Sequence, residues 1–434
     1  MALLKPPSCQ GCPLETLGEG FMVPQYGSNG VLLLGEALGE DEANHGKPFV
    51  GRAGFKLTRL IEWAGLDRGK FSIANSVWCR PPGNKLQGTS YQQGAIEHCK
   101  EVHWRRFLSH PVVIPLGNVP TEALLGKGPG ILDRRGYIYP IGGTTSYAIP
   151  TVHPSYIARG NAKWSAAFIA DLQKGVRLAE AGPVFEPTNY LLDPSPAGAL
   201  QWATEYRGQL HRDPSTYLAF DIETPGKPED EDEAEAGYED LPDQTWHIDR
   251  IGFSFAPHAA LSIPWEPPFF AAIRTLLSTE GPKVVWNKGF DVPRVRRMGF
   301  GINGIIHDGM IAWHVLHSDL PKKLAFVATF TCPWQPAWKH LSGSKPAFYN
   351  ATDADVELRS MIAIEKELRS TGLWEVYQRD VVCLEPILVH MHDKGMPIDQ
   401  EIRYDRAVKL QEAFRRTKDQ LGECIPEGAR RAQG

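Results

Sequence analysis

The sequence lacks the features of a membrane or secreted protein. None of its apolar stretches approaches the roughly 20 residues that a membrane-spanning helix needs, and the apolar run within residues 1–6 is too short for a secretory signal. Its seven cysteines are an odd number spread over 434 residues, whereas a disulfide scaffold pairs its cysteines in a short chain. We therefore expect no membrane partner and a reducing compartment, the cytoplasm of a bacterial or virus-infected cell.

The sequence also has no internal repeat, and its charge is unevenly distributed. The net charge is −5, but residues 1–182 carry 19 basic and 14 acidic side chains, while residues 183–434 carry 27 and 37. Nine of the acids lie in residues 229–243, which we expect to form a solvated loop. The basic excess of the first part suits a polyanionic partner such as a nucleic acid.

Short apolar runs alternate with helical patterns in residues 1–182. This alternation predicts a parallel sheet with helices on both faces, an αβα sandwich. A glycine–proline joint at residues 181–183 marks a boundary after it. The expected strands are 30–35, 71–75, 112–117 and 147–150, and the expected helices include 55–64 and 164–181.

The second part has a different pattern, with neighbouring strands and then long helices. Strands are expected at 216–223, 251–255 and 283–286, a long helix at 351–371, and helical stretches at 381–394 and 401–422. We expect a mixed sheet with a helical tail, and three domains in all, with the boundaries 1–182, 183–375 and 376–434.

Four cysteines of the first part form a candidate metal-ligand set: Cys9, Cys12, Cys79 and Cys99. Four thiolates suit either a tetrahedral zinc ion or an iron–sulfur cluster. A loop Cys-x-x-Cys with two ordinary buried cysteines is the alternative. The remaining cysteines, Cys332, Cys383 and Cys424, show no ligand spacing, so we expect them to be ordinary core or surface thiols.

Polar residues and glycine-rich loops follow the strands of the first part. Glu36 lies in GEALG (35–39), Phe49 in GKPFVGRAG (46–54), Asn75 at a strand end, and His153 in HPS (153–155). The carboxyl ends of parallel strands meet at one edge of a sheet, where open α/β sheets bind ligands. We therefore expect these residues to line one site.

Together these motifs strongly resemble the family 4 uracil-DNA glycosylases over about residues 5–180. The pattern also includes Asn75 followed by Cys79-Arg80-Pro81-Pro82-Gly83-Asn84, and it departs from the family at Leu38, where proline is usual. The resemblance implies excision of uracil from DNA and a [4Fe–4S] cluster on the four cysteines. Enzymes of this class take the base out of the helix before they act on it.

The residue types suit that chemistry. We expect stacking on the base by Phe49, recognition of its edge by Asn75, a hydrogen bond from His153 to the developing anion, and positioning of water by Glu36. Further candidates are Glu42 as a second acid, Ser155 in substrate binding, and Tyr156 or Ile157 as the wedge that fills the gap in the duplex.

A second constellation of acids lies in residues 183–375. Asp221 and Glu223 share one face of a strand, Asp291 follows a strand-to-helix turn, and Tyr349 and Asp353 lie four residues apart on a helix. Four oxygen donors at one site suit two Mg²⁺ or Mn²⁺ ions, and two such ions about 4 Å apart hydrolyse phosphodiesters. In this interpretation Tyr349 orients the attacking water.

These motifs resemble the DEDDy 3′–5′ exonucleases, specifically the proofreading domain of family A DNA polymerases, over about residues 186–375. The resemblance implies a ribonuclease H-like fold and action on DNA 3′ ends, with Asp308 as a supporting acid and residues 229–243 as an insertion. Residues 382–399 resemble the join to a polymerase thumb, but no palm or fingers follow. A DNA polymerase is therefore expected either in a longer form of this chain or as a separate partner.

We interpret the chain as a uracil-DNA glycosylase fused to a 3′–5′ exonuclease. One alternative is a module that senses uracil without excising it, and another is an exonuclease domain that has lost activity. The presence of Glu36, Asn75 and His153 argues against the first, and the full set of four acids argues against the second.

Overall fold

The computed structural model of the chain describes residues 3–225 and 247–424. The acidic run at 229–243 lies outside the described residues. The chain divides into two units, residues 1–382 and residues 383–434, and each is described by itself. The first unit contains two separate sheets.

The N-terminal sheet has five strands in the order β2-β1-β3-β5-β4. Three pairings place β2, β1, β3 and β5 parallel, and β4 is an antiparallel edge strand. The inner strands β1 and β3 are buried at every position because both of their faces are covered. The strands are β1 (Val31–Gly35), β2 (Ser72–Asn75), β3 (Val112–Pro115), β4 (Tyr139–Pro140) and β5 (Tyr147–Ala148).

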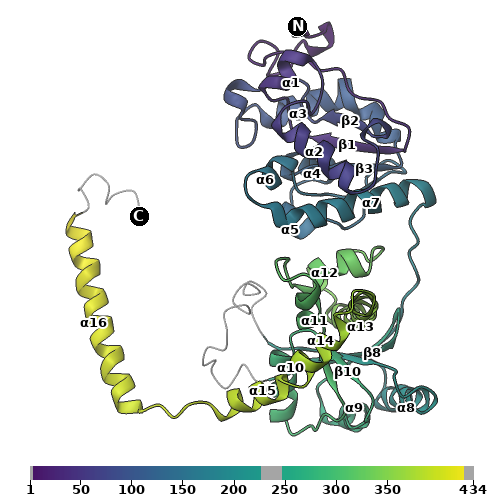
Figure 1. Cartoon of the computed structure of the whole chain (residues 1–434), viewed down its shortest axis with the longest axis vertical. Helices are drawn as coiled ribbons and strands as arrows, with labels where there is room; N and C mark the ends of the chain where they lie inside the picture. Colours follow the sequence, from purple (N-terminus) through teal and green to yellow (C-terminus); the bar gives the residue numbers. More distant parts are fainter. Residues whose placement is uncertain (1–2, 226–246, 425–434) are drawn as a thin grey trace. The chain divides into compact units, whose positions relative to one another are not determined.

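Helices cover both faces of this sheet, as Figure 1 shows. Leu33 packs into a core with Leu57 and Phe168, whereas its neighbour Leu34 packs into a second core with Trp104. Alternate side chains of one strand point to opposite faces, so the predicted αβα sandwich is confirmed. The helices are α1 (Glu40–His45), α2 (Arg52–Trp63), α3 (Gln92–Cys99), α4 (Asn118–Leu125), α5 (Ile131–Arg134), α6 (Pro154–Ala158) and α7 (Ser165–Ala181).

The C-terminal sheet of the first unit is mixed, with the order β11-β10-β7-β8-β9-β6. The expected neighbours β7 and β8 pair antiparallel, while β10 is parallel to both β7 and β11. The strands are β6 (Asn189–Leu192), β7 (Leu218–Glu223), β8 (Arg250–Ala256), β9 (Ala259–Pro264), β10 (Lys283–Val285) and β11 (Ile306–Asp308).

The long helix α13 (Pro346–Ser370) packs on β7, β8 and β9. It begins five residues before the expected start, because proline is well tolerated in the first turn of a helix. Tyr349 and Asp353 are therefore both helical. The other helices of this region are α8 (Pro196–Arg212), α9 (Phe270–Leu277), α10 (Lys288–Arg297), α11 (Gly309–Leu316), α12 (Leu324–Thr331) and α14 (Trp374–Val376).

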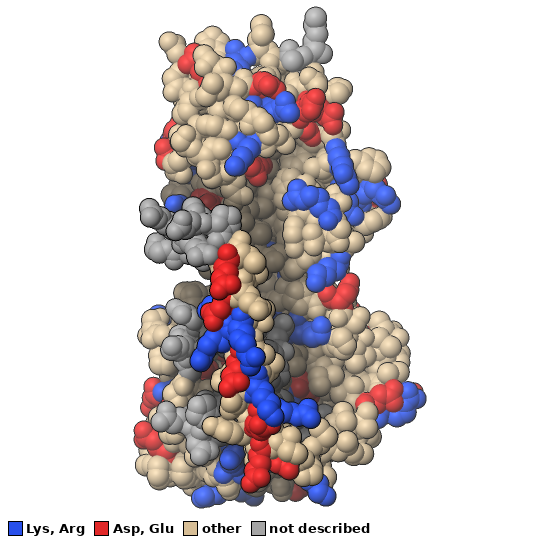
Figure 2. All heavy atoms as spheres, turned by 90° about the vertical axis from the view of Figure 1, so that its left-hand side faces the viewer, with Lys and Arg blue, Asp and Glu red and all other residues tan. Residues whose placement is uncertain are grey.

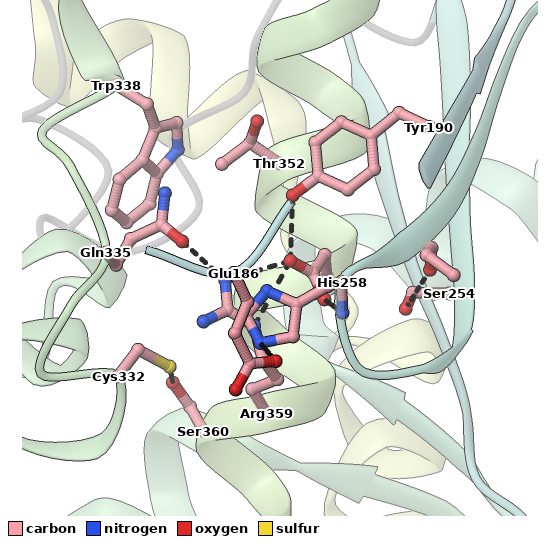
Figure 3. A network of polar contacts seen from close by, with 12 residues as sticks. Glu186, Tyr190, Ser254, His258, Cys332, Gln335, Trp338, Thr352, Arg359 and Ser360 are labelled. Carbon is pink, nitrogen blue, oxygen red and sulfur yellow. Dashed lines mark hydrogen bonds and ion pairs between the residues drawn. The ribbon is translucent and has the colours of Figure 1, made fainter. Parts of the chain in front are cut away.

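A buried carboxylate fixes α13 against the edge of this sheet. Asp355 accepts hydrogen bonds from the Tyr190 hydroxyl (2.7 Å) and the His258 main-chain N–H (2.7 Å), and it pairs with Arg359 (2.8 Å). Figure 3 shows this network, in which Arg359 also donates to Gln335. Because β6 and the turn between β8 and β9 are thereby tied to one helix, the side chains one turn earlier on α13 have a defined position.

The second unit contains two helices, α15 (Glu385–Lys394) and α16 (Gln400–Cys424). Their ends differ by a few residues from the expected 381–394 and 401–422, since residues 377–382 form a separate π-helical segment. Ion pairs between residues four apart, such as Lys409–Asp405, run along α16, and basic and acidic side chains alternate on the face shown in Figure 2. Among the described residues, no helix combines the length and apolarity that a membrane crossing requires.

Candidate functional site

At the carboxyl edge of the N-terminal sheet, side chains gather around Gly35: Glu36, Phe49, Asn75 and His153. We call this group the cup. Gly35 ends β1 and pairs with Asn75 at the end of β2. A Cβ at Gly35 would overlap with Asn75 Oδ1 and lie 2.7 Å from the Phe49 ring. Only glycine therefore lets both side chains approach the strand end. Phe49 has a left-handed backbone (φ 52°), which turns its ring toward the cup.

The Asn75 amide is buried with one atom left unpaired. Its Nδ2 contacts Met22 Sδ at 3.7 Å, whereas Oδ1 has no hydrogen-bond partner among the residues that the structure describes. A buried acceptor without a partner costs about 1–3 kcal/mol. The cup therefore holds an acceptor that a planar ligand with an N–H group can satisfy.

His153 faces the same cup, and its tautomer is defined. Its ring lies 5.9 Å from the Phe49 ring, centroid to centroid. Its Nδ1 accepts the main-chain N–H of Ser155 at 3.1 Å, so the proton resides on Nε2. Burial, aided by the charge of Arg159, lowers the pKa of His153 to about 4. The imidazole is thus a neutral donor at neutral pH.

The two candidate acids have different surroundings. Glu36, directly after β1, is partly buried, and burial raises the pKa of its carboxyl group. Glu42, on α1, accepts the main-chain N–H groups of Val50 (3.1 Å) and Gly51 (2.9 Å). Glu42 therefore braces the loop that carries Phe49, which leaves Glu36 as the acid at the strand end.

The other predicted residues near the cup either contact His153 or are buried in the core. Ser155 Oγ lies 2.7 Å from His153 Nδ1, so this side chain orients the imidazole. Leu38 is fully buried in the core. Ile157 is only 2% exposed, which rules it out as a wedge because a wedge must reach the DNA, whereas Tyr156 is partly buried.

The four predicted cysteine ligands line one cavity, together with Lys5 and Trp78. Burial, reinforced by the neighbouring thiols, raises the pKa of Cys79 to about 11 and that of Cys99 to about 12. Lys5 donates to the main-chain carbonyls of Leu14, Glu15 and Gly18, which closes the N-terminal segment over the cavity. Four thiols that line one cavity suit a positively charged inorganic group.

Sequence reasoning missed two residues that lie beside the cysteines of this cavity. His103 Nε2 lies 3.6 Å from Cys9 Sγ, and the imidazole stacks on Trp78 at 4.8 Å. A Cβ at Gly18 would lie 2.6 Å from Cys79 Sγ, so the cavity requires glycine there. No motif signals either role. Of the remaining cysteines, Cys332 is buried and Cys383 and Cys424 are exposed.

The second constellation brings three acids together on the C-terminal sheet. Asp221 and Glu223 of β7 and Asp353 of α13 have carboxylate oxygens within 4.8 Å of one another. Burial and mutual repulsion raise the pKa values of Asp221 and Glu223. Clustered carboxylates of this kind are stabilised by cations.

Asp291 lies beside this group but outside the set of three. Its Oδ1 accepts the main-chain N–H of Ile222 at 3.3 Å, and burial followed by the charge of Asp221 raises its pKa. Asp308 has a supporting role, because its carboxylate accepts main-chain N–H groups at the starts of α10 and α11. Both acids thus shape the backbone around the cluster.

A lysine that sequence reasoning missed reaches into the cluster. Lys339 Nζ lies 3.1 Å from Asp353 Oδ1 and donates to the Tyr349 hydroxyl at 2.9 Å. Trp338 Nε1 donates to the same Asp353 oxygen at 2.9 Å. Burial alone would lower the pKa of Lys339, but the carboxylates of Asp353 and Asp221 outweigh burial and raise it. The site therefore holds one cation of its own.

Two further residues of α13 complete this site. Asn350 donates to Asp221 Oδ2 at 2.9 Å and accepts from Ser262, so it orients the first acid. Glu357 is buried, its Oε2 has no partner within the described ranges, and burial together with the charge of Asp221 raises its pKa. Its position one helical turn after Asp353 could have marked Glu357 as a site residue, but its burial follows only from the packing of α13.

Comparisons with known proteins find similarity in the region of the chain that carries the cup. The uracil DNA glycosylase superfamily model matches residues 24–173. The type-4 uracil-DNA glycosylase of Thermotoga maritima is 35% identical over 159 residues, which are 35% of this chain and 78% of that protein. The type-4 enzyme of Saccharolobus solfataricus is 36% identical over 157 residues, 34% of this chain and 71% of that protein.

Two weaker similarities concern polymerases. DNA polymerase I of Rhizobium leguminosarum is 27% identical over 169 residues, which are 34% of this chain and 16% of that protein. The solved POL domain of Pol1 from M. smegmatis, in complex with DNA primer-template and dNTP, has a TM-score of 0.38 and 14% identity. It covers 52% of this chain and 36% of that chain.

Proposed function

The chain belongs to the type-4 uracil-DNA glycosylases, and from that membership we propose that the cup at Gly35 hydrolyses the N-glycosidic bond of uracil in DNA. The observation that carries this assignment is the unpaired Asn75 Oδ1 beside the Phe49 ring. Uracil offers an N3–H to that oxygen and a carbonyl to the amide Nδ2, whereas cytosine has no N3–H. The ring of Phe49 supplies the stacking surface.

The chemistry follows from the two groups on either side of the base. Bond cleavage sends the C1′–N1 electron pair to uracil, and His153 Nε2–H donates to the anion that develops at O2. Glu36 stabilises the positive sugar and holds the water whose oxygen adds to C1′, and its carboxylate takes up the proton that this water releases. Because His153 is neutral, it stabilises the anion by a hydrogen bond and keeps its own Nε2 proton.

Release of free uracil from a single-stranded oligonucleotide tests this assignment. The wild-type chain should release uracil, and Asn75→Ala should lose most of the activity while Ser155→Ala retains more. A wild-type chain that binds uracil-containing DNA without releasing the base would support the sensing module instead. Circular dichroism of each variant separates lost chemistry from lost folding.

For the four cysteines we propose a [4Fe–4S] cluster with a structural role. Tetrahedral zinc would hold its sulfur atoms about 3.8 Å apart, but among the described residues no three of these thiols have sulfur atoms within 4.8 Å of one another. The wider arrangement suits a cluster, which would tie the N-terminal segment to the loop after Cys79. Iron and sulfide analysis of the purified protein tests this assignment. A brown protein that contains both supports the cluster, and a colourless protein without them contradicts it.

For the second site we propose 3′–5′ hydrolysis of DNA. The observation that supports it is the set of three carboxylates, Asp221, Glu223 and Asp353, within 4.8 Å. Two Mg²⁺ or Mn²⁺ ions held by these residues would supply the metal-activated water, and Tyr349, whose hydroxyl accepts from Lys339 beside Asp353, would orient that water. Incubation with 3′-ended single strands and Mn²⁺ should yield a ladder of products. A silent domain would leave the strand intact.

A further inference from the structure

The helix that follows the Phe49 loop exposes two aromatic rings. On α2, Phe55 is 67% and Trp63 is 52% exposed, while Leu57 and Leu60 of the same helix are buried. Arg52, Phe55, Lys56, Arg59 and Trp63 stand at positions i, i+3, i+4, i+7 and i+11, so they share one face. We call these five residues the α2 strip.

The cations of the α2 strip have no carboxylate partners. Lys56 Nζ and Arg59 Cζ lie 4.8 and 5.0 Å from the centre of the Trp63 ring. Within the described part of the chain, neither they nor Arg52 form an ion pair, although Glu62 flanks them on the helix. Burial and the charge of Arg59 lower the pKa of Lys56. The strip therefore attracts anions.

The α2 strip begins at the cup. Arg52, three residues after Phe49, reaches the main-chain carbonyl of Ala158 at 3.5 Å, at the end of the helix that His153 caps. Arg159 follows, and its charge acts on His153. From Arg52 to Trp63 the helix rises by about 16 Å, which is the length of a few nucleotides. The cations thus lead away from the cup along a line.

We propose that the α2 strip is a track for single-stranded DNA, on which bases next to the excised uracil stack on Phe55 and Trp63 while the three cations hold phosphates. This inference rests on the proposed glycosylase function. Exposed rings favour a single strand because only unpaired bases present their faces for stacking. A protein or lipid partner would not need cations interleaved with the rings at this spacing.

Fluorescence anisotropy of a labelled, uracil-free single strand tests the track on the full chain, without divalent metal so that the strand stays intact. Trp63→Ala and Phe55→Ala should each weaken binding at least about fivefold, and Arg59→Gln should reduce the salt slope by about 0.7. Arg212→Gln on α8 removes an equal charge from another exposed helix and should change nothing. Binding of a duplex should hardly respond to Trp63→Ala.

Unchanged single-strand affinity in both aromatic variants would overturn the track, and so would an equal loss for single strand and duplex. Uracil release separates this result from failure of the glycosylase assignment. If the wild type releases uracil, the aromatic variants should raise KM for a single-stranded substrate and leave kcat nearly unchanged. If it releases none, but the variants still lose single-strand binding, the α2 strip binds single strands, and its link to uracil excision fails together with the glycosylase assignment.

Discussion

The two candidate sites of the first unit differ in how they prepare for a ligand. The cup at Gly35 combines the apolar ring of Phe49 with two uncharged polar groups, an unpaired acceptor on Asn75 and a neutral His153, and holds a single acid, Glu36. The site on β7 and α13 gathers like charges, Asp221, Glu223 and Asp353, and sets Lys339 among them. One site therefore suits an uncharged planar base, and the other suits cations and the phosphates that accompany them.

The largest expected effect separates the two activities. The double variant Asp221→Asn/Glu223→Gln removes two of the three clustered carboxylates, so exonuclease activity should fall by ~10³-fold or more, beyond the 10–100-fold typical of outer-shell changes. Uracil release should be unaffected, because the cup lies on the other sheet. Both rates should be measured on the same preparation. Loss of both activities would mean that the two sites do not act independently.

The reciprocal variant acts on the cup. His153→Ala removes the donor to the developing anion, and loss of one such donor typically lowers kcat by about 10²–10³-fold. The Mn²⁺-dependent ladder on 3′ ends should persist. Steady-state uracil release measures the first effect, and a His153 variant with wild-type kcat would exclude this residue from the chemistry.

The lysine in the acidic site sharpens the contrast further. Lys339→Met removes a cation 3.1 Å from Asp353, so Mn²⁺ should bind about tenfold more tightly, since like charges in a partly buried site repel strongly. The exonuclease kcat should fall, because Tyr349 loses the donor that holds its hydroxyl. Calorimetric Mn²⁺ titration gives the affinity. Weaker metal binding in the variant would mean that Lys339 supports the metals.

The smallest expected effect concerns pH: His153 should not titrate near neutral pH. Burial lowers the pKa of His153 to about 4, and protonation of Nδ1 would break its hydrogen bond from Ser155 N–H. The neutral form therefore persists from above pH 4 upward, and kcat/KM for uracil release should show no break near the ordinary histidine value of about 6.5. A pH profile measures this. A break near 6.5 that disappears in His153→Gln would contradict the neutral donor.

Local pattern was enough to predict the αβα sandwich, because buried strands and amphipathic helices are encoded in short periodicities. It also put Asp221 and Glu223 on one face of β7, since strand side chains alternate. The same reasoning did not find Lys339, Trp338 or His103, which lie in or beside short π-helical and 3-10 turns that are too short to show a periodic pattern. Ile157, one of the two residues predicted as a possible wedge, is buried, and its burial depends on the packing of α6 rather than on its residue type.

Sequence alone determined which chemical groups follow each strand: Glu36 after β1, Asn75 at the end of β2, and the paired acids of β7. Tertiary structure decided which of those groups share a site. The packing of α13 places Asp353 beside the β7 acids, whereas Asp291 accepts a main-chain N–H. Among the described residues, Asn75 Oδ1 has no hydrogen-bond partner. The physical reason is that strand and helix periods are local, whereas desolvation and close approach depend on segments far apart in the chain.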